Sequence, residues 1–267
     1  MSTLPNEHEE YLKKKKKEKR IVLIFQILLL LSFLLLWEIA AHYEWINTFL
    51  SSSPSLVLKT FLSLFEQNDL FSHIGVTAYE TFLSFAIASL IGLSVSILLW
   101  WFPRLAKILD PYLTVLNSLP KVALGPLIII WVGASTNSII FMALLICIFL
   151  SIINIYHDFL STDSSYITLL KSLGAKKKDI FLKVILPGNL SNIINNLKIN
   201  VSMAFIGVIM GELLVSKKGL GYLIMYGTQV FNINLVITSV FLLGILSFLF
   251  YYLICLIEKI IQKKTAN

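Results

Sequence analysis

The chain has 267 residues, of which 57% are hydrophobic and only 14% are charged, and its mean hydropathy is +0.82. Soluble domains are about 45–50% apolar and about 25% charged, so these values exclude a water-soluble enzyme and a disordered chain. The formal net charge of +7 comes mainly from lysines beside apolar segments, which is typical of membrane proteins, and the two cysteines exclude a disulfide-built secreted domain.

The first predicted element is a transmembrane helix over Ile21–Trp37, which follows a basic tail over residues 1–20. Such a lysine-rich flank marks the cytoplasmic end of a first span. A cleaved signal peptide ending near Ala40 and Ala41 is the alternative, but its apolar region is usually only about 7–15 residues long. We expect residues 21–73 to hold this span and an outer surface segment, in which Ser53-Pro54 opens a short helix.

Five further apolar stretches predict transmembrane helices near 74–101, 108–133, 138–157, 191–213 and 236–258. With the N-terminus inside, six spans return a short tail over residues 259–267 to the cytoplasm. This orientation places 17 basic residues on the inner side and 3 on the outer side, as the positive-inside rule requires. The sequence therefore predicts an all-α integral membrane protein with about six transmembrane helices and a core over residues 74–258.

Several spans carry residues that lipid would not favour. A stripe of small residues every four positions in the second span predicts close helix packing; it consists of Ser84, Ala88, Gly92 and Ser96. The third span is interrupted by prolines, and Pro120 with Lys121 lies at its centre, so we expect either a kinked packing helix or backbone that lines a wet cavity.

The fifth span has asparagines on one face, and it ends near an acid. Asn192, Asn196 and Asn200 either form hydrogen bonds between helices or line a passage. Glu212 lies near the outer end, where interfacial water lowers the energetic penalty of a charge. The candidate pathway residues are Pro120, Asn196, Asn200 and Glu212.

The longest inner loop, residues 159–187, carries the most specific pattern. Asp163 or Ser164 can cap a helix whose apolar side chains, Tyr166, Leu169, Leu170 and Leu173, follow helical spacing. Gly174 stands where a left-handed helix stop is needed. A second short helix follows and is expected to end at Pro187. An exposed loop with this apolar pattern indicates a partner or a neighbouring helix that covers it.

This loop resembles the "EAA" signature of importer permeases of the ATP-binding cassette (ABC) superfamily. Gly174, Val184, Leu186 and Pro187 match the motif, with Leu173 and Ala175 beside the glycine, whereas Thr168, Leu169 and Leu170 replace the E-A-A residues. Further segments resemble the nitrate/sulfonate/taurine permease subfamily: Asp110-Pro111-Tyr112-Leu113, Leu119-Pro120, Trp131-Val132-Gly133 and Gly219-Leu220-Gly221-Tyr222-Leu223-Ile224.

The resemblance implies the type I ABC importer (MetI-like) permease fold in a bacterial inner membrane. Two copies would form the pathway, each inner loop would seat in a cytoplasmic ATPase subunit, and an outer binding protein would deliver the solute. The residues expected at the ATPase contact are Leu169, Leu170, Ser172, Leu173, Gly174, Ala175, Lys176 and Pro187. The subfamily implies a sulfonate, taurine or nitrate as the solute, or a thiamine precursor or another vitamin-like solute.

The chain itself is expected to be non-catalytic and to bind no cofactor. It has no G-x-x-x-x-G-K-[ST] motif, so ATP would be used by the partner ATPase. The four histidines lack ligand spacing, which argues against a metal site, and no catalytic constellation supports an intramembrane enzyme. The main rival is an ion-coupled secondary transporter with Glu212, Lys121 or Lys198 as its coupling charge. That rival does not account for the apolar inner loop.

Overall fold

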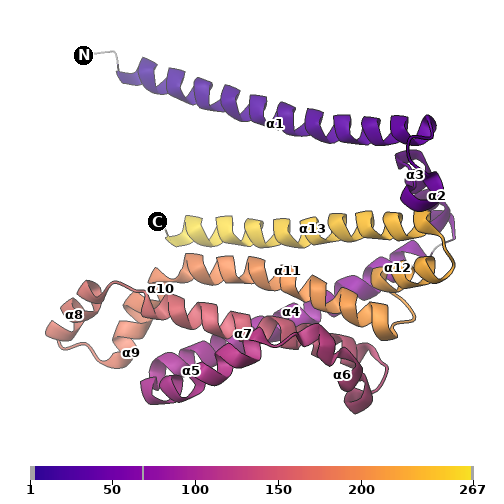
Figure 1. Cartoon of the computed structure of the whole chain (residues 1–267). Coiled ribbons are helices and arrows are strands. Elements are labelled where there is room, and N and C mark those ends of the chain that lie inside the picture. Colours follow the sequence, from indigo (N-terminus) through magenta and orange to yellow (C-terminus); the bar gives the residue numbers. More distant parts are fainter. Residues whose placement is uncertain (1–3, 68, 266–267) are drawn as a thin grey trace.

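A computed structural model describes residues 4–67 and 69–265, with side chains described over 11–67 and 69–261 (Figure 1). All regular elements in these ranges are helical. They are α1 Leu4–His42, α2 Thr48–Ser51, α3 Pro54–Glu66, α4 Leu70–Trp101, α5 Pro103–Ser118, α6 Gly125–Val132, α7 Thr136–Leu160, α8 Ser164–Ser172, α9 Lys177–Ile180, α10 Leu186–Gly188, α11 Leu190–Val215, α12 Leu220–Gln229 and α13 Ile233–Thr265. The predicted all-α membrane fold is confirmed.

Five of the predicted spans are single helices. In the described residues, α1, α4, α7, α11 and α13 are long and apolar enough to cross a membrane. The basic segment before Ile21 is helical from Leu4 and continues into the span without a break. The surface helix expected after Ser53-Pro54 is α3, where the Ser53 hydroxyl accepts a hydrogen bond from the backbone N–H of Leu56 at 3.3 Å.

The interruption expected in the span near 108–133 is present, and it is a sharp break at Leu119-Pro120. Here α5 ends at Ser118, a 3₁₀ turn covers Lys121–Leu124, and α6 leaves at an angle of 81° to α5. Leu119 is extended because it precedes a proline, whose ring disfavours the helical conformation of the preceding residue, and Pro120 has no N–H to donate. By length and composition, the pair is either a sixth, broken span or a re-entrant loop.

The centre of the bundle is formed by α4, α7 and α11, which pack closely along small residues. The predicted stripe from Ser84 to Ser96 is buried. The Ser96 hydroxyl bonds to the carbonyl oxygens of Gly92 at 2.8 Å and Ile152 at 3.0 Å, and so links α4 to α7. On α11, Gly207 lies against the backbone of Ala143, where a Cβ atom would not fit. The stripe therefore serves helix packing.

The two ends of the bundle differ in what they present (Figure 1). The N-terminal end of α1, the C-terminal end of α13 and the short helices α8 and α9 lie at one end, whereas α3 and α12 lie at the other. Within the chain, α1 contacts α3 and α13, with Trp37 stacked on Phe241 at a centroid distance of 6.0 Å. Most of its apolar side chains are otherwise exposed, as expected of a helix that faces lipid.

Candidate functional site

The first half of the inner loop is a capped helix that stops at Gly174. The Asp163 carboxylate accepts a hydrogen bond from the backbone N–H of Ser165 at 2.8 Å, which caps α8 and lowers the pKa of that carboxyl group. At the other end, the N–H of Ala175 bonds to the carbonyl oxygen of Leu170 and the N–H of Gly174 to that of Lys171, both at 3.0 Å. This is a Schellman motif, and Gly174 has the φ of +78° that it requires.

The second half of the loop anchors it to the bundle. Ile180, Phe181 and Ile185 are buried, and the Phe181 ring lies against Trp100 at a centroid distance of 4.9 Å. Lys177 donates to the backbone oxygen of Trp101 at 2.6 Å and lies over the indole rings of Trp100 and Trp101. The loop is thereby fixed to the C-terminal end of α4.

The second helical segment of the loop ends at Gly188, within one residue of the predicted end at Pro187. A π-helical turn over Phe181–Ile185 leads into α10, and Pro187 lies in the first turn of α10. Pro187 has no N–H to donate to the hydrogen-bond ladder, and the helical segment that begins with α9 ends one residue later, at Gly188. Pro187 is exposed, so this segment runs almost directly into α11.

The free face of α8 is apolar. Tyr166, Leu169 and Leu173 are 61%, 57% and 73% exposed, although they are large hydrophobic residues at helical spacing. Leu170 and Ala175 instead pack against the buried side chains around Phe181 and Ile185. Ser172, Gly174 and Lys176 border the exposed face, and the Ser172 hydroxyl bonds to the carbonyl oxygen of Thr168 at 3.0 Å. This face has the character of a docking surface.

Gly174→Val is expected to prevent the loop from binding its partner. A left-handed backbone costs about 1–2 kcal/mol for an L-residue, and a β-branched side chain adds to this. No heavy atom lies within 4 Å of a Cβ placed at Gly174, so the strain is conformational and not a collision. Pull-down of the cytoplasmic partner with the purified variant measures the effect.

Gly188→Val is the matched control for that experiment. Gly188 also has open space around its Cβ position, but its φ is not positive, so valine fits its backbone. Normal recovery of the partner with Gly174→Val would contradict the prediction.

The asparagines of α11 form hydrogen bonds between helices. The Asn196 side-chain oxygen accepts from Ser151 at 3.2 Å, and the Asn200 amide nitrogen donates to Ser151 at 3.0 Å and to Ser89 at 3.2 Å. Both asparagines are buried, and the Asn200 side-chain oxygen has no hydrogen-bond partner among the described residues. Hydrogen bonding between helices therefore accounts for most of the polar groups of Asn196 and Asn200, and we call this row of asparagines along α11 the α11 seam.

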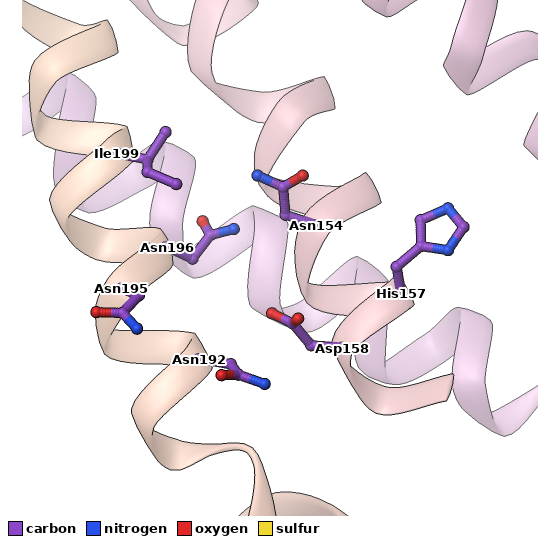
Figure 2. Close-up of a pocket in the computed structure, with 7 residues that line it drawn as sticks. All are labelled: Asn154, His157, Asp158, Asn192, Asn195, Asn196 and Ile199. Carbon is purple, nitrogen blue, oxygen red and sulfur yellow. The ribbon is translucent and has the colours of Figure 1, made fainter. Parts of the chain in front are cut away.

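The seam opens at the inner end into a polar pocket of about 290 Å³ between α7 and α11 (Figure 2). The residues that line it are Asn154, His157, Asp158, Asn192, Asn195, Asn196 and Ile199. In Figure 2, Asn154 and Asp158 extend from α7 toward α11, whereas the His157 ring points away. Sequence reasoning missed Asn154 and Asp158, although their i, i+4 spacing near the end of an apolar span was a usable signal.

Glu212 was expected in interfacial water, but the structure places it in a buried cluster at the end of the bundle that carries α12. It is 1% exposed, and its carboxylate accepts hydrogen bonds from the Thr77 hydroxyl at 2.6 Å and the Gly221 N–H at 2.5 Å. Thr77 in turn accepts from the Leu220 N–H at 2.8 Å. These bonds join α4 and α11 to the start of α12.

A second acid, Glu80, lies beside Glu212 and is fully buried. Neither of its carboxyl oxygens has a hydrogen-bond partner among the described residues. Sequence reasoning missed Glu80, although a lone acid within a long apolar span is a recognisable signal of a functional or structural role. Gly219 has a φ of +115° and lies directly against the Glu212 carboxylate, so only glycine fits there.

The two lysines of the spans, Lys198 and Lys121, have local partners. Lys198 forms an ion pair with Glu258 of α13 at 2.7 Å, and Lys121 donates to the carbonyl oxygen of Asn117 at 2.7 Å. Pro120 is exposed at the break between α5 and α6. None of these contacts places Lys198, Lys121 or Pro120 in the polar pocket.

Comparison with known proteins gives one consistent family. A model described as "Binding-protein-dependent transport system inner membrane component" matches residues 88–267. The formylaminopyrimidine transport permease protein ThiX of Halalkalibacterium halodurans is 29% identical over 231 residues, covering 86% of this chain and 92% of ThiX. The putative aliphatic sulfonates transport permease protein SsuC of Bacillus subtilis is 27% identical over 230 residues, covering 86% of this chain and 83% of SsuC.

Two further comparisons agree. The taurine transport system permease protein TauC of Escherichia coli is 27% identical over 221 residues, covering 81% of this chain and 80% of TauC. A chain of the inward-facing MetNI methionine ABC transporter superposes with a TM-score of 0.62 at 21% identity, covering 73% of this chain and 96% of that one, which shows a shared fold. These relatives support the importer hypothesis and not the ion-coupled alternative.

Proposed function

The chain belongs to the family of binding-protein-dependent transport system inner membrane components, and it is the permease of an ABC importer; from this premise we propose how it couples and what it carries. The family implies a cytoplasmic ATPase and an outer binding protein as partners. The exposed face of α8 is the coupling surface, and it seats in a cleft of the ATPase. The observation that supports this is the contrast within one loop, where Phe181 and Ile185 are buried but Leu169 and Leu173 are exposed.

The same-side arrangement of both chain ends and the coupling loop supports cytoplasmic termini (Figure 1). The lysine-rich flanks of those segments give the direction, since basic residues are retained on the inner side. We propose that two copies of the chain form the pathway, as the resemblance to type I importer permeases implies. The chain is a non-catalytic subunit that binds no cofactor, and the partner ATPase uses the ATP.

The solute is a small polar organic molecule. The named relatives carry formylaminopyrimidine, aliphatic sulfonates and taurine. The proposed path runs along the α11 seam from Asn200 and Asn196 to the inner pocket, with the Pro120 break and the Glu212 cluster controlling helix positions at its sides. Hydrogen-bonding side chains inside a bundle are typical of such paths.

Crosslinking tests the coupling surface. A cysteine introduced at Ser172, which borders the exposed face of α8, combined with cysteines along the ATPase cleft, is expected to give a disulfide-linked permease–ATPase species in membrane vesicles. Uptake by those vesicles should also stop when the ATPase is inactivated. Uptake that continues without the ATPase, or crosslinking that occurs only from the outer side, would contradict the proposal.

A further inference from the structure

The inner pocket between α7 and α11 is lined mainly by asparagine side chains, together with one acidic residue. Carboxamides come from both helices, with Asn154 on α7 and Asn192 and Asn196 on α11 (Figure 2). The one acid, Asp158, lies on the same side of α7 as Asn154. No lysine or arginine lines the pocket. Side chains of this kind are too polar to face lipid, so the pocket opens toward the interior of the assembly or toward water.

Several polar atoms in this pocket are available for a ligand. Among the described residues, the side chains of Asn154 and Asp158 have no hydrogen-bond partner within the chain, although both point into the space between the helices. Asn196, which is buried, uses its side-chain oxygen for Ser151. The nearest lysine on α11, Lys198, is instead paired with Glu258 on another helix. Lys198 also donates to the side-chain oxygen of Asn195, a lining residue, at 3.3 Å, but its charge is compensated by Glu258. The His157 ring of the lining points away from the pocket (Figure 2), so no uncompensated cation faces a ligand there.

This arrangement selects among the solutes of related permeases. An amide presents a donor beside an acceptor, which matches an amino group beside a ring nitrogen, as asparagine matches adenine in nucleic-acid recognition. A carboxylate accepts from an amino group and attracts a protonated ring, but it repels a sulfonate or nitrate. Accordingly, we propose that this pocket is a solute-binding station that takes an amino-substituted nitrogen heterocycle, such as an aminopyrimidine, and rejects sulfonates; this rests on the proposed permease function.

Equilibrium binding to the complete permease–ATPase complex tests the assignment. Radiolabelled formylaminopyrimidine is the probe, and taurine and a short alkanesulfonate are the competitors, all without the binding protein. The wild-type complex should bind the pyrimidine, and neither competitor should displace it. Absence of pyrimidine binding, or displacement by taurine, overturns the proposal.

Two substitutions of one residue separate charge from folding. Asp158→Asn should weaken pyrimidine binding about tenfold or more, because a hydrogen bond to a charged group is lost. Asp158→Lys should abolish pyrimidine binding and create sulfonate binding, a gain that a misfolded variant cannot show. Asp69→Asn removes the same charge from an exposed position at the outer end and should bind like the wild type.

The failure of this inference is distinguishable from failure of the proposed function. If the permease does not copurify with an ATPase at all, the coupling proposal fails. If the complex forms and hydrolyses ATP, but Asp158→Asn binds pyrimidine normally or Asp158→Lys gains no sulfonate binding, only the pocket assignment fails.

Discussion

Leu173→Asp is expected to abolish copurification of the ATPase and to stop ATP-driven uptake. Leu173 ends α8 with 73% of its side chain exposed, so the substitution leaves the fold of the isolated permease intact. On docking, a leucine that is removed from water contributes about 1.5–3 kcal/mol, and an aspartate at the same place would have to be desolvated without a partner. The loss should therefore exceed a hundredfold in affinity, measured by titrating purified ATPase onto permease in detergent or nanodiscs.

The control for Leu173→Asp is another exposed leucine of the same loop that lies outside α8. Leu182 follows Phe181 in the anchored half of the loop, and 48% of its side chain is exposed. Leu182→Asp should retain the ATPase because α8 supplies the docking face. If both variants lost the same ATPase affinity, an added charge anywhere in the loop would be sufficient to prevent binding, and the exposed face of α8 would not be the docking surface.

Glu212→Gln is expected to lower the thermal stability of the permease and to reduce transport. Both carboxylate oxygens of Glu212 accept a hydrogen bond, one from Thr77 and one from Gly221. An amide has one acceptor, so its NH₂ group would face one of these donors. Leaving a buried donor unsatisfied costs about 1–3 kcal/mol. The expected result is a lower apparent melting temperature in detergent, with the contact between α12 and α4 loosened.

Glu80→Gln makes the matched comparison at the neighbouring acid. Glu80 lies beside Glu212, and its carboxyl oxygens have no hydrogen-bond partner among the described residues. The substitution removes one of two adjacent acids and supplies an amide that can donate to Glu212. We expect the melting temperature to stay the same or to rise. A fall equal to that of Glu212→Gln would show that the two acids contribute alike and that the hydrogen-bond assignment for Glu212 is incomplete.

The helices that connect these regions explain how one subunit can combine coupling and transport. The loop is held to α4 by Phe181 and Lys177, and it continues into α11 through α10. The same α4 and α11 meet at the outer end through Thr77 and Glu212. A displacement of the docked loop therefore acts on helices that reach both ends of the bundle, consistent with switching between two packed states.

The sequence alone determined the membrane class, most of the spans and the local geometry of the coupling loop. These features depend on neighbouring residues: apolar runs such as Ile21–Trp37 define spans, and the Asp163 cap with the Gly174 stop defines α8 through backbone preferences. The break after α5 has a local cause in the Leu119-Pro120 pair. Only the tertiary structure decided the burial of Glu212 beside Glu80 and the pocket that joins Asp158 to Asn192. Those features arise from contacts between residues far apart in the chain, and hydrophobic periodicity carries no information about which distant polar groups will meet.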